Sequence, residues 1–151
     1  MSVRRGMGRF GAVAALTLAA ACIAFSQLCL DETVAYARER QTFGKALIEH
    51  QVVRHKLVDM AMNINAAQAM LESIAWRIGQ GERPVAEICM LKNMATTTME
   101  TCARHAVQTF GGAGYIRGNK AERIYREVRV NAIGGGAEEI MRDLAARQMG
   151  W

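Results

Sequence analysis

The stretch that decides the fold is residues 49–78, EHQVVRHKLVDMAMNINAAQAMLESIAWRI. Its apolar residues recur in alternating steps of four and three, at Val53, Leu57, Met60, Ile64, Ala67, Leu71, Ile74 and Ile78. This spacing is the a/d pattern of a helix that packs along a neighbouring helix at a shallow angle. Charged residues such as Arg54, Asp59 and Glu72 fall outside this seam. The stretch therefore predicts a long helix with one buried stripe.

A second amphipathic helix is predicted on the C-terminal side, from Pro84 to about Phe110. Proline is favoured in the first turn of a helix, where its missing N–H costs nothing. One stripe of this segment is apolar, with Ile88, Leu91, Ala95, Met99, Cys102 and Ala106. Because only a short Gly-rich turn separates the two helices, we expect them to be antiparallel neighbours.

The N-terminal side allows two interpretations. Three Arg residues within residues 1–9 precede a charge-free run, FGAVAALTLAAACIAF, at residues 10–25. This order resembles a secretory signal, with cleavage near Ala19-Ala20-Ala21. The other interpretation is a buried helix, because the sequence continues as SQLCLDETVAYARERQ with no Gly or Pro before Gly44. We favour the second and predict that residues 12–40 form the central, most buried helix, which Gly44 ends, with these residues on one side: Leu16, Ile23, Leu30, Val34 and Ala37.

Glycine-rich turns divide the C-terminal third of the chain. Residues 111–119, GGAGYIRGN, separate the Pro84–Phe110 helix from a short helix through Val128, for which Asn119 and Glu122 form a capping-box-like start. Residues 134–136 are all glycine, and a last helix is predicted from about residue 137. The fold class is therefore all-α, an up-down four-helix bundle with a short extra helix. We expect the bundle at residues 16–151 and an atypical extension of its first helix at residues 1–15.

Composition limits the classes of function. At 151 residues the chain fits one domain, and one Pro and ten Met argue against a β-sandwich or a disordered linker. The net charge of +5 and 6% aromatic content come without a basic run, which argues against nucleic-acid binding. No Cys lies in a C-x-x-C pair, so we expect no metal site and four buried free thiols in a reducing compartment, at Cys22, Cys29, Cys89 and Cys102.

Three segments carry chemistry that the residues alone leave open. Arg40 and Lys45 flank a turn just before His50, and they could clamp a phosphate or form an exposed basic turn. Residues 108–115, QTFGGAGY, permit either the close approach of a ligand or an ordinary helix stop. The glycines at 134–136 could expose N–H groups to an anion at a helix N-terminus, or form a plain turn.

The order of these motifs is more specific than any one of them. The chain contains YARERQTFGK, then EHQ, then QTFGGAGY, then ERIYREVR, then IGGGAEEI. In this order they resemble the C-terminal helical domain of the acyl-CoA dehydrogenase flavoproteins, over roughly residues 16–151. The resemblance implies a four-helix bundle, FAD as cofactor, and acyl-CoA and an electron-transferring flavoprotein as partners. In that family a carboxylate removes the α proton of an acyl-CoA while the β hydrogen passes to the flavin as hydride.

The resemblance also implies site residues. The family's flavin contacts correspond here to two groups of residues. The first group is Arg40, Gln41, Thr42, His50 and Gln51. The second matches a Gln-x-Phe-Gly-Gly segment that reaches the FAD of a neighbouring subunit and consists of Gln108, Thr109, Phe110, Gly111 and Gly112. Ala137, Glu138 and Glu139 match a further cofactor-binding stretch. Gly136 matches a backbone contact to the acyl thioester.

The chain departs from the family at the catalytic base. Many members carry the base in a Tyr-Glu-Gly-Thr loop, where this chain has Gly135. Others carry it at the start of the first helix, where this chain has Ala14. Neither carboxylate is present, and the loss of a general base typically costs about 10²–10⁴-fold in rate. We therefore assign no catalytic residue.

Two hypotheses follow. In the first, the chain is the C-terminal domain of an acyl-CoA dehydrogenase-like flavoprotein, inactive alone because two domains and the catalytic Glu are missing. In the second, it is a non-catalytic helical bundle that assembles with itself or with a full-length relative. The opening MSVRRGMGRFGAVA is expected to be a new start joined to a truncated domain. We expect the chain to form a homo-oligomer. We expect it to be cytoplasmic, and the alternative is that the signal-like N-terminal segment directs its export.

Overall fold

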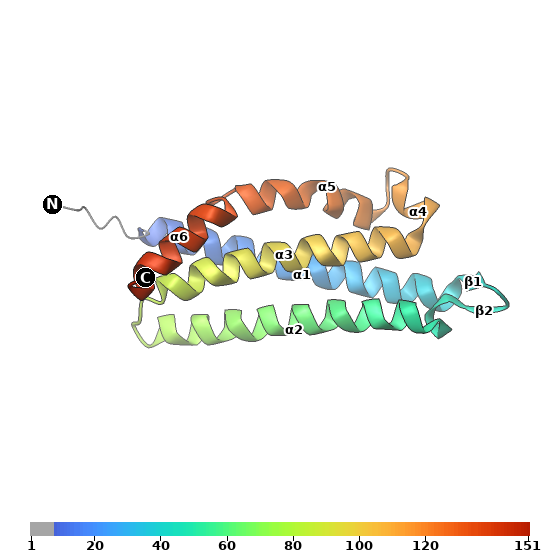
Figure 1. Cartoon of the computed structure of the whole chain (residues 1–151), viewed down its shortest axis with the longest axis horizontal. Helices are drawn as coiled ribbons and strands as arrows, with labels where there is room; N and C mark the ends of the chain where they lie inside the picture. The colour runs from blue at the N-terminus through green and yellow to red at the C-terminus, as the bar shows by residue number, and fades with distance from the viewer. Residues whose placement is uncertain (1–7) are drawn as a thin grey trace.

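Five helices of at least three turns make up almost all of the fold. The computed structural model describes residues 8–151, which form α1 (Arg9–Glu39), α2 (Gln51–Gly79), α3 (Val85–Phe110), α5 (Lys120–Ile133) and α6 (Glu138–Met149). Helices α1, α2, α3 and α5 alternate in direction (Figure 1). Helix α5, continued by α6, forms the fourth helix of the bundle. The predicted all-α, up-down four-helix bundle is confirmed, with the four-residue helix α4 (Gly112–Tyr115) as a short extra element.

The central helix is α3, so the prediction for residues 12–40 is wrong on this point. Helix α3 packs against α1, α2, α5 and α6, and its buried residues run along most of its length. Figure 1 shows it between α2 and α5, with α1 behind. Helix α1 is buried along one side only, because it has fewer neighbours.

The buried seam of α1 consists of small side chains. Its members are at most 5% exposed and include Ala15, Ala19, Cys22, Ile23, Ser26, Cys29, Thr33 and Ala37. Of the predicted side, Ile23 and Ala37 are buried, whereas Leu16, Leu30 and Val34 are only partly buried. Small residues allow two helix axes to approach closely, and the most buried positions of α1 are mainly alanine and cysteine, while Leu16 and Leu30 pack against the margin of the core.

Helix α2 confirms the predicted seam, with one exception. Val53, Met60, Ile64, Ala67 and Ile74 are buried, and Leu57 and Leu71 are partly buried against the core. The exception is Ile78, which is 40% exposed because it lies in the last turn before the chain leaves the bundle.

Two boundaries differ from the prediction. Helix α1 ends at Glu39, and Gly44 lies instead in a hairpin of β1 (Gln41–Thr42) and β2 (Lys45–Ala46), which pair antiparallel. A 3₁₀ turn at Leu47–Glu49 then leads into α2. Helix α5 is longer than predicted. Asn119 caps it by accepting a hydrogen bond from the Ala121 N–H (2.8 Å), but it continues past Val128 to Ile133.

Residues 1–7 lie outside the described residues, and so does part of the predicted extension at residues 1–15. Within α1, residues 11–39 contain a window long and apolar enough for a membrane span by length and composition. That property is also common to core helices and signal sequences. Ala15, Ala19 and Cys22 are buried in the hydrophobic core, so one side of this segment packs in the bundle, although only 33% of the apolar window is buried.

Candidate functional site

The first group of predicted site residues lies around the hairpin that follows α1. Arg40 caps α1 through its N–H, which donates to the Tyr36 carbonyl (2.9 Å), and its own carbonyl accepts from the Leu47 N–H (2.7 Å). His50 Nε2 lies 3.0 Å from Thr42 Oγ1 and 3.3 Å from the Thr42 carbonyl oxygen. The imidazole therefore ties the start of α2 to the first strand of the hairpin.

The hairpin turn holds Phe43 in the left-handed region, at φ 51°, with its side chain 97% exposed. Gly44 follows at φ 80°, which glycine adopts without strain. A non-glycine residue at positive φ is uncommon, and a fully exposed aromatic ring on such a residue gains nothing from burial. The turn thus presents an aromatic ring outward, between Arg40 and His50.

The second group lies at the C-terminal end of α3, at the same end of the bundle as the hairpin (Figure 1). Tyr36 connects the two groups, because its ring packs on Phe110 at a centroid distance of 4.7 Å and its hydroxyl donates to the Phe110 carbonyl (3.4 Å). Gln108, Gly111 and Gly112 are exposed beyond this contact. Helix α3 stops at Gly111, which has φ 60°.

The composition of this end fits one edge of a flavin nucleotide. Arg40, Gln41, Gln51 and Gln108 offer exposed hydrogen-bond donors, and no ion pair within residues 8–151 occupies the Arg40 guanidinium. An added Cβ at Gly111 or Gly112 would meet no atom within 4 Å, so the backbone there is open to a ligand. These residues form a wall rather than an enclosed pocket, and a ligand site normally buries most of the ligand.

The remaining predicted residues lie in the turn between α5 and α6, at the opposite end of the bundle. Gly135 and Gly136 have φ of 71° and 119°. Ala137 is the N-cap residue of α6, and Glu138 and Glu139 lie in its first turn, where the helix macrodipole favours carboxylates. The Glu138 carboxylate pairs with Arg142 (2.9 Å).

Two residues of α3 that sequence analysis missed hold this turn. The side chain of Lys92 is fully buried, and its Nζ donates to the carbonyls of Ala132 (2.6 Å) and Gly136 (2.7 Å). Asn93 Nδ2 donates to the Glu138 carbonyl (2.9 Å). Burial lowers the pKa of Lys92, while the nearby Glu138 carboxylate opposes this shift. A charged residue among Ile88, Leu91 and Ala95 was the sequence feature that could have revealed this contact.

The turn that contains Gly135 lies against α1, the helix that contains Ala14. Gly134 lies against Leu18, since a Cβ on Gly134 would be 4.0 Å from Leu18 Cδ1. Ala14 lies one helical turn before Leu18, on the same face of α1. Ala14 and Gly135 are both exposed.

The two ends of the candidate site are too far apart to form one pocket. Lys92, which contacts the α5–α6 turn, and Gln108 are both on α3 and are separated by 16 residues. At about 1.5 Å per residue they are about 24 Å apart along the helix axis. The predicted contacts therefore fall into two separate regions.

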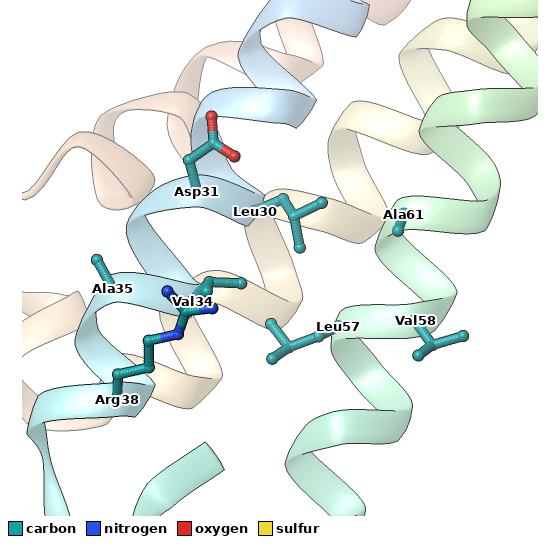
Figure 2. A pocket seen from close by; sticks show the side chains of 8 residues that line it. All are labelled: Leu30, Asp31, Val34, Ala35, Arg38, Leu57, Val58 and Ala61. Carbon is teal, nitrogen blue, oxygen red and sulfur yellow. The ribbon is translucent and has the colours of Figure 1, made fainter.

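An open groove of about 430 Å³ lies between α1 and α2 and contains none of the predicted site residues. Figure 2 shows Leu30, Val34 and Leu57 pointing toward one another, with Asp31 and Arg38 on the α1 side. Val58, at the far side of the groove, is 63% exposed. The groove is mostly apolar and lacks the convergent polar groups of a small-molecule site.

The four cysteines are free and buried, as predicted. Burial raises the pKa of Cys22 and Cys102 to about 11 and that of Cys29 to about 12. Thiols with such pKa values are poor nucleophiles near neutral pH. No group of three or more His, Cys, Asp or Glu residues in the described part of the chain could hold a metal ion.

Comparison with known proteins gives one consistent result. The family described as acyl-CoA dehydrogenase, C-terminal domain, matches residues 7–150. The acyl-CoA dehydrogenase AFT10-1 of Alternaria alternata is 36% identical over 142 residues, which cover 87% of this chain and 33% of that protein.

Solved structures agree with this match. The acyl-CoA dehydrogenase of Geobacillus kaustophilus is 29% identical, with a TM-score of 0.90, over 93% of this chain and 37% of that one. Butyryl-CoA dehydrogenase from Megasphaera elsdenii is 26% identical, with a TM-score of 0.87, over 91% of this chain and 36% of that one. The chain thus spans about a third of the length of these relatives.

Proposed function

The chain belongs to the acyl-CoA dehydrogenase family, and on this premise we propose that it acts as the C-terminal helical domain of a flavoprotein that dehydrogenates acyl-CoA. The observation that carries the proposal is the meeting of two distant segments at one end of the bundle. Residues 40–51 and 108–112 are joined there by the Tyr36–Phe110 contact, and both expose hydrogen-bond donors. Such a surface suits the edge of a dinucleotide.

In this proposal the two ends of the bundle serve different flavins. The hairpin end would contact the FAD of a neighbouring subunit through Arg40, Gln41, Thr42, His50, Gln51 and residues 108–112. The stretch Ala137–Glu139 would contact the FAD of its own subunit. The separation of about 24 Å along α3 supports this division, because the two surfaces face separate regions. FAD, when bound, would supply the hydride acceptor, and this chain would supply contacts only.

The substrate in this proposal is an acyl-CoA, with electrons passing on to an electron-transferring flavoprotein. Gly136 would contact the thioester through its N–H, because its carbonyl already accepts from Lys92. The base would have to come from outside the chain, since Ala14 and Gly135 fill both family positions. Glu138 and Glu139 are poor substitutes, because the positive end of α6 favours their ionised form and so lowers their basicity.

The second candidate function, a non-catalytic bundle that associates with itself or with a full-length relative, is favoured by the apolar α1–α2 groove. Leu30, Val34 and Val58 line it, and Val52 and Met62 on α2 are also largely exposed. Apolar surface of this extent promotes association. A homo-oligomer is compatible with either function.

We propose a cytoplasmic location, with export as the alternative. Cleavage near Ala19–Ala21 would remove Ala15 from the α1–α3 seam and would cut that seam at Ala19. A signal peptide that forms part of the folded core is not expected, because it is lost from the mature protein.

Reconstitution in trans tests the proposed function. The chain would be co-expressed with the Geobacillus kaustophilus relative lacking its own helical domain, and flavin absorption would be measured on the copurified complex. We expect the complex to retain flavin and Arg40→Ala to reduce retention, whereas Arg83→Ala, at the exposed α2–α3 connection, would not. A complex that forms without flavin, or equal flavin retention in both variants, would favour the non-catalytic bundle.

A further inference from the structure

Three consecutive glycines connect α5 and α6, and glycine loses more conformational freedom on folding than any other residue. Two of them adopt positive φ, and Gly135 has no heavy atom within 4 Å of where a Cβ would lie. No side chain at Gly135 therefore selects one backbone conformation. Groups that contact the turn from outside can make this selection.

Lys92 and Asn93 make those contacts, at both sides of the glycines. Ala132 is in the last turn of α5, whose carbonyls have no partner within the helix and carry partial negative charge. The Lys92 ammonium donates hydrogen bonds to both this carbonyl and the Gly136 carbonyl, and the Asn93 amide donates one to the Glu138 carbonyl. A fully buried ammonium is costly unless it is hydrogen-bonded, so these carbonyls and Lys92 stabilise one another.

The direction of the Gly136 carbonyl determines where the next N–H points. A trans peptide is planar, with its C=O and N–H groups antiparallel, and the described residues contain no cis peptide. Because the Gly136 oxygen points to Lys92, the Ala137 N–H points away from α3. An oxygen acceptor on the outer side of the turn would meet this N–H.

We infer that Lys92 and Asn93 are positioning residues that fix the α5–α6 turn from inside the bundle and present the Ala137 N–H outward. Lys92 is not itself a base in this arrangement, because its Nζ is fully buried and donates to two carbonyls. The role of the turn as a ligand-binding element rests on the proposed function. The clamp itself is a property of the folded chain and is testable without any ligand.

Hydrogen exchange of the full chain tests this inference. The Gly134 amide donates to the Val130 carbonyl (2.7 Å) and the Met141 amide to the Ala137 carbonyl (3.0 Å), so both report on the turn. In Lys92→Met, which keeps most of the length of the side chain and removes its donors, these amides should exchange at least about tenfold faster. For amides in the middle of α3, the exchange rate divided by the rate expected from global unfolding should be the same in the variant as in the wild type.

Two further variants keep the test decisive. Lys56→Met, on α2, is the control for the change in residue type, because Lys56 makes no hydrogen bond or ion pair recorded within residues 8–151, and it should leave the turn unchanged. Asn93→Leu should speed exchange at the start of α6 but not at Gly134, and it decides the matter if Lys92→Met fails to fold. Unchanged exchange around the turn, or an equal increase throughout the chain, would overturn the inference. Neither outcome depends on flavin or acyl-CoA, so a failed proposal for function would be seen separately.

Discussion

Ile64→Ala should lower the free energy of unfolding by about 2–5 kcal/mol, because Ile64 is only 4% exposed at the centre of the α2 seam. The change removes three carbon atoms. At about 0.8 kcal/mol for each buried methylene, transfer to water alone accounts for about 2.4 kcal/mol. The cavity left between α2 and its neighbours adds to this value to the extent that the helices do not relax.

Leu71→Ala on the same seam should cost less, about 1–2 kcal/mol, because Leu71 is only partly buried. Urea unfolding followed by circular dichroism measures both changes, with free energies taken from the midpoints at a common slope. All variants need the same protein concentration, because self-association would add to apparent stability. Asn65→Ala, on the exposed side of α2, should stay within about 0.5 kcal/mol of the wild type.

The contrast between these variants is what tests the packing of α2. A loss below about 0.5 kcal/mol for Ile64→Ala would mean that the seam does not form the core. A larger loss for Leu71→Ala than for Ile64→Ala would contradict the register of α2 against α1 and α3.

Three further predictions concern the site, pH and assembly. Ala14→Glu, which restores a carboxylate within α1, should change the free energy of unfolding by no more than about 0.5 kcal/mol, because Ala14 has ordinary helical backbone angles. Gly135→Glu should cost about 1–2 kcal/mol, because φ is 71° at Gly135. Equal costs in thermal unfolding would refute this. Burial, with Lys56 and Arg104 nearby, lowers the pKa of His105, so stability should fall as the pH drops from about 7 to about 5, and His105→Gln should flatten that profile; an unchanged profile in urea unfolding would be evidence against it. The chain should self-associate at micromolar concentration through its exposed apolar surface, and light scattering that shows only the 16.6 kDa species would exclude this.

Sequence reasoning worked best where large apolar side chains mark the buried side. The α2 seam could be predicted because Met60, Ile64 and Ile74 are both large and buried. It was only partly right on α1, where Ile23 and Ala37 are buried as predicted, but most of the buried side consists of Ala, Cys, Ser and Thr and the leucines lie at the margin. The predicted side of α1 was drawn mainly through its large residues, so the small residues at the centre of the contact, such as Ala15, Ala19 and Cys22, were left out of it.

The candidate site shows a second limit. The hairpin was missed because each strand has two residues, and a two-residue strand leaves no period to detect. Local sequence patterns also could not predict the contact of Tyr36 with Phe110 or of Lys92 with Gly136, because these pairs are 74 and 44 residues apart. The resemblance to a family supplied the motifs, and the fold supplies the contacts that hold them.

The most direct test of the central claim is whether the isolated chain holds flavin and turns over substrate. The purified chain would be checked for folding by circular dichroism, mixed with excess FAD and desalted, after which flavin absorption and dye reduction with an acyl-CoA would be measured. We predict a helical protein that loses its flavin on desalting and reduces no dye, because one wall of a site cannot bury a dinucleotide and both base positions lack a carboxylate. Stoichiometric flavin in the protein fraction together with steady turnover would contradict the account.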